Sequence, residues 1–346
     1  MRMKNFVMNK ISYLLTALLL PGAFACKKSG INSNSPANVY VAGFTTRGLV
    51  NVATYWKNGQ PVFVSDTTKN ASANAIAVSE NDVYLAGVQL NAVGSYNAAT
   101  YWKNGKPVFL TNGLKRANAS AIAVSGNDVY VAGNEYVNGY DKIYAAYWKN
   151  GSTRVNLTTG NTSAEARAIT LSGNNVYVAG YESNGKLNLA KYWKNGNPFN
   201  LSDGANNAEA YSIAVSGNDV FVAGFEYIAP HSAATYWKNN TRKAITDGKQ
   251  DALAVSVTVS GNDVYIAGFE SDGKHSIAKI WKNDKLFQTL SDGKNDAFAD
   301  AVVVSGNDVY AAGYEYIGGH TISKYWKNGN LISLLDGWVF SICLSK

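Results

Sequence analysis

An all-β fold is predicted by three features of this chain of 346 residues. The segment Ser125–Gly133 (SGNDVYVAG) recurs along the chain, in the first repeat only as its second half. The glycine that ends the segment returns at intervals of 44 to 47 residues. A Tyr-Trp-Lys-Asn motif or a close variant occurs seven times. The apolar runs are short, rich in Val, Ile, Tyr and Ala, and without helical periodicity. Four short strands in each repeat of this length indicate a seven-bladed β-propeller.

Each repeat divides into four antiparallel strands. Gly126-Asn127 is suited to a tight turn between the first and second strands. Pro61, Pro107 and Pro198 stand at the start of the fourth strand, and proline is tolerated at a sheet edge, so the fourth strand is expected outermost. In the third repeat the strands are expected at Ala119–Ser125, Asp128–Glu135, Tyr144–Trp148 and Thr153–Thr158.

The propeller is expected to span residues 38–346 and to close on itself. The first repeat begins at Asn38 with its second strand, and Trp338–Ser345 aligns with the first strand of the other repeats. We expect residues 338–345 to join the first blade, which removes two open sheet edges. Cys343 is then a small apolar residue of a buried strand. The chain has only one other cysteine, Cys26, so no disulfide framework is expected.

Residues 1–25 have the features of a signal peptide: basic residues, an apolar run too short to span a bilayer, and small residues before Cys26. This ending resembles a bacterial lipobox, which implies cleavage before Cys26 and lipidation of its thiol. Residues 26–37 would then be the lipidated cysteine and a polar tether. The expected location is the cell envelope, on the outer membrane of a Gram-negative bacterium.

The net charge argues against a nucleic-acid partner. It is +7 for the whole chain, but the first 25 residues hold three basic residues and no acidic residue. The remaining 28 basic and 24 acidic residues give a net charge of +4, which is too small to indicate nucleic-acid binding.

The repeats resemble those of bacterial β-propeller proteins, through the sequence Ala-Ile-Ala-Val-Ser-Gly-Asn-Asp-Val-Tyr-Val-Ala-Gly followed by Tyr-Trp-Lys-Asn-Gly. The resemblance covers residues 38–346 and concerns the fold. That broad class has no single activity, so the resemblance implies no catalytic residue.

The candidate ligand site consists of two sets of equivalent positions, or columns, that vary from blade to blade. Both lie near the start of the first strand, which we call its upper end. Counted back from the last serine of that strand, the fifth and the seventh positions differ from blade to blade, whereas their neighbours are almost always Ala or Ser. We expect these side chains to converge on the mouth of the central channel and to suit a ligand that is both stacked and hydrogen-bonded. Drift at positions without packing demands explains the variation equally well. The candidate ligand-binding residues are Asn74, Ser120, Glu165, Arg167, Glu209, Tyr211, Asp300, Phe340 and Trp338.

Other charged groups are less specific. A glutamate ends the second strand in five repeats, and a lysine stands in all seven turns between the third and fourth strands. The lysines are either solvated turn residues or a ring that faces an anionic membrane. The three histidines occupy equivalent positions in blades 5, 6 and 7 and are not expected to share a metal. No metal site, cofactor or catalytic motif is identified.

The sequence therefore favours a membrane-anchored, monomeric lipoprotein whose propeller binds a glycan, a peptide or an envelope protein at the channel mouth. Two alternatives stay open. The first is a hydrolase or lyase that acts on polysaccharide through carboxylates of the upper face. The second is a structural scaffold of the envelope.

Overall fold

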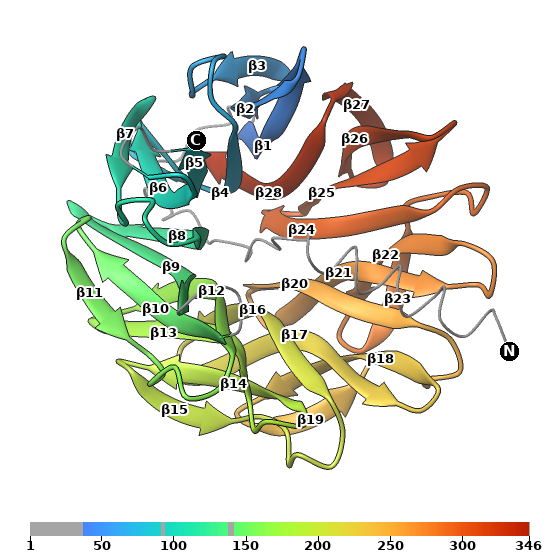
Figure 1. Cartoon of the computed structure of the whole chain (residues 1–346). Coiled ribbons are helices and arrows are strands. Elements are labelled where there is room, and N and C mark those ends of the chain that lie inside the picture. Colours follow the sequence, from blue (N-terminus) through green and yellow to red (C-terminus); the bar gives the residue numbers. More distant parts are fainter. Residues whose placement is uncertain (1–36, 91–93, 138–141, 346) are drawn as a thin grey trace, which may run out of the picture.

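The computed structural model describes residues 37–90, 94–137 and 142–345. In these ranges the chain forms 28 strands, which Figure 1 shows as seven sheets arranged in a ring. Each sheet has four strands in antiparallel order. The predicted seven-bladed β-propeller is confirmed. The described residues include no helix that could cross a membrane.

The innermost strands carry the Ala-Ile-Ala-Val runs and line the centre of the ring (Figure 1). They are β4 (Ala71–Ser79), β8 (Ala117–Ser125), β12 (Ala164–Ser172), β16 (Ala208–Ser216), β20 (Ala252–Ser260), β24 (Ala297–Ser305) and β28 (Trp338–Ser345). The second strands are β1 (Asn38–Arg47), β5 (Asp82–Leu90), β9 (Asp128–Val137), β13 (Asn175–Ser183), β17 (Asp219–Ile228), β21 (Asp263–Ser271) and β25 (Asp308–Ile317).

The third and fourth strands lie toward the outside of the ring (Figure 1). The third strands are β2 (Val50–Lys57), β6 (Asn97–Lys103), β10 (Lys142–Lys149), β14 (Asn188–Lys194), β18 (His231–Lys238), β22 (Ser276–Lys282) and β26 (His320–Lys327). The outermost strands are β3 (Gln60–Phe63), β7 (Lys106–Phe109), β11 (Thr153–Asn156), β15 (Asn197–Asn200), β19 (Thr241–Ala244), β23 (Lys285–Thr289) and β27 (Asn330–Asp336).

The C-terminal strand closes the ring as expected. β28 pairs with β1 from Asn38–Ser345 to Phe44–Trp338, so blade 1 is built from both ends of the propeller. Cys343 is fully buried in β28, which agrees with its predicted packing. It is also disulfide-bonded, which contradicts the expectation that cysteines make no such bond here.

Asparagine explains why the Lys-Asn turn recurs. Asn150 adopts a left-handed conformation at φ 53°, which Asn tolerates better than most residues. Its side-chain Oδ1 accepts a hydrogen bond from the Val129 amide at 2.8 Å, and its Nδ2 donates to Asp128. The equivalent asparagine accepts the same amide hydrogen bond in all seven blades, at 2.8–2.9 Å. This residue ties the turn to the start of the second strand.

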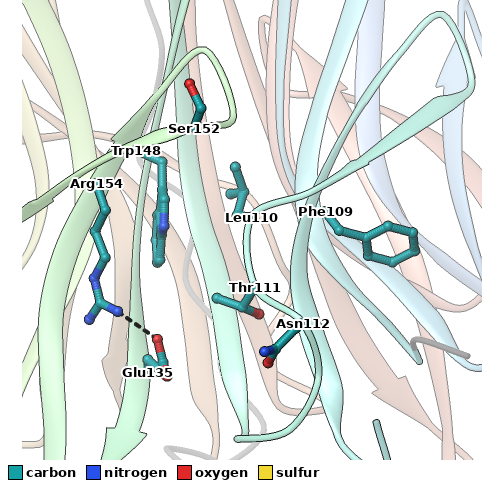
Figure 2. A pocket seen from close by; sticks show the side chains of 8 residues that line it. All are labelled: Phe109, Leu110, Thr111, Asn112, Glu135, Trp148, Ser152 and Arg154. Atoms are coloured by element: carbon teal, nitrogen blue, oxygen red, sulfur yellow. Dashed lines mark hydrogen bonds and ion pairs between the residues drawn. The ribbon is translucent and has the colours of Figure 1, made fainter. Parts of the chain in front are cut away.

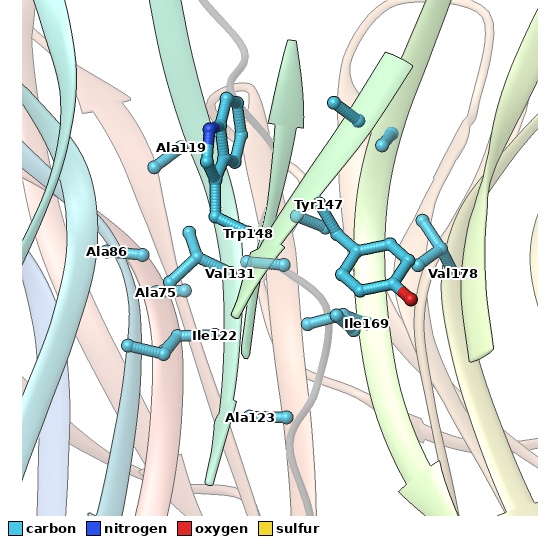
Figure 3. Packing of buried hydrophobic residues seen from close by; sticks show 14 of the residues in the cluster. Ala75, Ala86, Ala119, Ile122, Ala123, Val131, Tyr147, Trp148, Ile169 and Val178 are labelled. Atoms are coloured by element: carbon cyan, nitrogen blue, oxygen red, sulfur yellow. The ribbon is translucent and has the colours of Figure 1, made fainter. Parts of the chain in front are cut away.

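The core lies between neighbouring blades. Tyr147 and Trp148 point to opposite faces of their sheet, and Tyr147 lies beside Val178 of the next blade (Figure 3). All seven repeat tryptophans are at most 3% exposed. Burial of one such side chain contributes about 4–6 kcal/mol, from roughly 150–250 Å² at about 25 cal/mol per Å². The repeat tryptophans are therefore core residues and are not exposed platforms for a sugar.

Candidate functional site at the channel mouth

A β-bulge places the first variable column. In every blade the innermost strand shifts register by one residue against the second strand near its upper end. The extra residue is the one at the fifth position back from the last serine. A bulge re-aims a side chain and leaves its residue outside the ladder. The seven bulge residues are Asn74, Ser120, Arg167, Tyr211, Val255, Asp300 and Phe340.

The repeated glycine of the VYVAG segment makes room for this bulge. A Cβ atom on Gly133 would lie 2.0 Å from the carbonyl oxygen of Asn118 on the facing strand. At the seven equivalent glycines the same contact would be 1.7–2.0 Å, which is far below any tolerable distance. The fixed glycine and the variable bulge residue are therefore two parts of one structural feature.

The bulge residues fill the centre of the ring. All seven are at most 7% exposed. In the second column Asn118, Glu209 and Phe298 are buried as well, whereas Ser72, Glu165, Leu253 and Trp338 are partly exposed. The predicted residues thus converge, but the first column forms a packed layer and the second column supplies the side chains that reach solvent.

One half of this layer is polar and is paired across blades. The Arg167 guanidinium donates to Glu165 at 2.9 Å and to Glu209 of the next blade at 2.7 Å. Glu209 also accepts hydrogen bonds from the Tyr211 hydroxyl at 3.0 Å and from Asn188 at 2.6 Å. Burial lowers the pKa of Arg167, but Glu209, Tyr211 and Glu165 raise it by more, so the pKa lies well above its ordinary value and Arg167 stays charged.

A second polar group lies between blades 2 and 3. Asn74 donates to the side chain of Asn118 at 2.9 Å and to the carbonyl of Ala119 at 3.0 Å. Asn118 donates in turn to Ser120 at 2.8 Å. Here too the bulge residue of one blade is hydrogen-bonded to the next blade, so substitutions in this layer are coupled.

The other half of the layer is aromatic. Its central ring is Trp338, whose ring centroid lies 4.9 Å from Tyr314, 6.0 Å from Tyr316 and 6.4 Å from Phe340. Phe298 stacks on Tyr314 at 5.0 Å. We call Phe298, Tyr314, Tyr316, Trp338 and Phe340 the aromatic cluster.

Asp300 belongs to this apolar half. It is 1% exposed, and no described residue forms a hydrogen bond to its Oδ2 atom. Burial raises the pKa of this carboxyl well above its ordinary value. The hydroxyl of Tyr314, which is also fully buried, has no hydrogen-bond partner among the described residues.

The five glutamates that end the second strands are all ion-paired within their own blade. Their partners come from either the third or the fourth strand. In blades 1 and 2, Thr45 and Gln89 replace the glutamate, and Thr45 hydrogen-bonds to Thr54 at 3.2 Å. A base thus accompanies each acid, which is typical of structural pairs. The pairs are Glu135–Arg154, Glu182–Lys191, Glu226–Arg242, Glu270–Lys279 and Glu315–Lys324.

The seven lysines of the turns between the third and fourth strands form a ring on the face opposite the channel mouth, which we call the lower face. The charge of this ring is largely neutralised. Five of its lysines form ion pairs of 2.8–2.9 Å with the aspartate that begins the second strand, as Lys149 does with Asp128. In blades 1 and 4 that position holds Asn38 and Asn175. The ring carries much less net positive charge than seven lysines suggest, so it gives little support to a membrane-facing role.

A shallow groove between blades 2 and 3 was not found by sequence reasoning. Its volume is about 570 Å³, and Figure 2 shows Arg154 beside Trp148 with Glu135 below. The guanidinium carbon of Arg154 lies 5.8 Å from the centroid of the Trp148 ring, and Arg154 contacts Glu135 at 2.7 Å. The signal in the sequence is that Arg154 stands opposite Trp148, where three other blades have proline.

Several expectations concern chemistry elsewhere. The described residues hold no group of three His, Cys, Asp or Glu side chains that could bind a metal ion. His231 and His275 each face an aspartate that directly precedes the innermost strand of the next blade, Asp251 at 3.4 Å and Asp296 at 3.8 Å. The predicted signal peptide, Cys26 and the predicted tether up to residue 36 lie outside the described residues.

Solved propeller structures are similar to this chain. An acylaminoacyl peptidase of Pyrococcus horikoshii matches 83% of this chain at 12% identity with a TM-score of 0.50, and the chain spans 48% of that protein. One of two prolyl endopeptidases matches 87% at 11% identity and 0.50, and the chain spans 49% of it. The β-propeller domain of the Trilobed protease from Pyrococcus furiosus, described as having an open velcro topology, matches 83% at 11% identity and 0.51, over 87% of that domain. At these identities the likeness concerns the fold alone. No protein-family model and no curated protein sequence matches the chain.

Proposed function

We propose that this protein is a binding module of the bacterial cell envelope and that it holds its ligand at the mouth of the central channel. The observation that supports this proposal is the bulge in every blade, which presents a different side chain on an otherwise repeated scaffold. Above the buried layer, the partly exposed Glu165, Leu253 and Trp338 offer a carboxylate, an apolar side chain and an aromatic ring. This combination suits a glycan, a peptide or a segment of an envelope protein.

The enzyme alternative has less support. Glu165 and Glu209 both form ion pairs with Arg167, at 2.9 Å and 2.7 Å. Asp300 lies in the other, aromatic half of the layer. A general acid and a general base that face one substrate bond are therefore not found among these three carboxyl groups.

Glycan and peptide arrays probed with the purified protein test the binding role. The informative variants are Glu165→Ala and Trp338→Ala, because these side chains reach solvent. Arg167 and Tyr211 are poor targets, because their loss removes buried hydrogen bonds. Asp219→Ala on the lower face is the control. We expect a ligand whose affinity falls about tenfold or more in the first two variants and is unchanged in the control. Absence of any ligand, or equal loss in the control, overturns the proposal and leaves a structural scaffold.

The lipid anchor is proposed from residues 1–26 alone. Mass spectrometry of the protein extracted from a Gram-negative host tests the anchor. A diacylglyceryl group on Cys26 supports it, and an unlipidated Cys26 overturns it.

A further inference from the structure

Two buried polar atoms in blade 7 have no partner among the described residues. They are Oδ2 of Asp300 on β24 and the hydroxyl oxygen of Tyr314 on β25. Both residues are at most 1% exposed. An unsatisfied buried polar group costs about 1–3 kcal/mol, so two of them close to one aromatic cluster need a physical explanation.

The charge around Asp300 is unusual for this protein. The buried acids Glu209, Glu226 and Glu315 each have a basic partner. Asp300 forms no ion pair with any described residue. Its charge acts on two tyrosines of the aromatic cluster, Tyr314 and Tyr316, and the faces of aromatic rings carry partial negative charge. The unfilled carboxylate oxygen and the ring faces both attract positive charge.

The aromatic cluster is open on one side. Tyr314 and Phe340 are buried, but Trp338 and Tyr316 are partly exposed. The ring of Trp338 packs on the ring of Tyr314, with centroids 4.9 Å apart, so a partly exposed ring covers a residue whose buried hydroxyl has no hydrogen-bond partner among the described residues.

We propose that the aromatic cluster, together with Asp300, binds the protonated primary amine of a ligand. One N–H of the ammonium donates to Oδ2 of Asp300 and another donates to the Tyr314 hydroxyl oxygen, while the rings contribute cation–π attraction. A quaternary ammonium has no N–H to donate and leaves both oxygens unsatisfied, so a primary amine is selected over it. The inference rests on the proposed binding function and names the ligand class for that site.

The raised pKa of Asp300 agrees with this arrangement. Without a ligand, burial favours the neutral carboxyl. A bound ammonium supplies the missing counter-charge, so the carboxyl proton leaves to solvent as the amine binds. Net charge at the site is conserved by this exchange.

Titration calorimetry with the full-length protein tests the proposal with three probes: n-butylammonium, tetramethylammonium and n-butanol. We expect n-butylammonium to bind about tenfold or more tightly than the other two. Asp300→Asn is expected to weaken it by about tenfold or more, and Tyr314→Phe by roughly three- to tenfold. Asp308→Asn, at the other end of the same blade, is the matched control and is expected to leave binding unchanged. Thermal unfolding of each variant verifies the fold.

Two results overturn the inference: no preference for n-butylammonium, or equal affinity in Asp300→Asn and the unchanged protein. The proposed function is tested separately on the arrays. A neutral ligand that is lost in Trp338→Ala but kept in Asp300→Asn retains the channel-mouth function and rejects the amine.

Discussion

The buried ion pair between Arg167 and Glu209 allows the role of the bulge layer to be measured. Arg167→Met keeps most of the volume of the side chain and removes its charge. The side chains of Arg167 and Glu209 are 9% and 6% exposed, so solvent screens their interaction little. Loss of one partner from a buried pair costs about 3–5 kcal/mol, because the remaining charge is left uncompensated. Glu209 keeps its hydrogen bonds from Tyr211 and Asn188, which places the expected loss near 3 kcal/mol.

The assay is a double-mutant cycle by urea unfolding, followed by tryptophan fluorescence and circular dichroism. Glu209→Gln alone should also cost about 3 kcal/mol, whereas Arg167→Met/Glu209→Gln should lose only about 1–2 kcal/mol in total. Glu165→Gln is the matched control, since Glu165 binds the same arginine but its side chain is 26% exposed. It should cost less than about 1 kcal/mol. A loss below about 1 kcal/mol in Arg167→Met, with additive behaviour in the double variant, refutes the view that this layer is a packed structural unit.

Three further predictions concern single residues. Asp300→Asn should become more stabilising relative to the unchanged protein as pH rises above about 4, by up to about 1.4 kcal/mol per pH unit. Burial raises the pKa of Asp300 in the folded protein, so the contribution of this carboxyl to stability is fully present below the unfolded-state pKa and is lost as pH rises toward the folded-state pKa. Urea unfolding at several pH values measures this difference, and a pH-independent difference contradicts the prediction. Gly133→Ala should lower the free energy of unfolding by about 3 kcal/mol or more, since its Cβ would lie 2.0 Å from a carbonyl oxygen. Gly126→Ala should lower it by about 1 kcal/mol, because Gly126 has φ 58° but no atom within 4 Å of the added Cβ. Equal losses in the two variants would exclude the steric explanation. Glu80→Gly should stabilise the protein by about 0.5 kcal/mol, because Glu80 has φ 56° where the other turns have glycine; a lower melting temperature would contradict this.

Most of the fold could be predicted because it depends on local, repeated signals. Turn residues, short apolar runs and proline at the outer edge each occur several times, so the number of blades and the closure by residues 338–345 follow from alignment of the chain with itself. The β-bulge could not be predicted with the same ease. Its signal is one extra residue in the innermost strand opposite the glycine at position 133 and its equivalents, and such a shift leaves the apolar pattern almost unchanged.

The candidate site was predicted as a set of positions but not as a chemical environment. The variable columns do converge, yet sequence spacing gives no information about burial. Arg167 and Glu209 are 42 positions apart, and only the packing of blade against blade brings them to 2.7 Å. The groove beside Trp148 was not predicted from the sequence for the same reason. It depends on which side chain lies opposite Trp148 in the neighbouring strand.

The pairing between blades bears on whether the variable columns reflect drift. Asn74 is bonded to Asn118 and Arg167 to Glu209, in each case across two neighbouring blades. A single substitution at one of these positions leaves a buried polar group without its partner, at a cost of about 1–3 kcal/mol or more. The polar residues of the column therefore cannot change independently, because each one satisfies the hydrogen bonds of its partner in the next blade. Asp300 is the exception, because no described residue compensates it. A buried carboxyl that the scaffold does not satisfy is the feature of this layer that packing leaves unexplained, and it is the one at which a ligand has most to contribute.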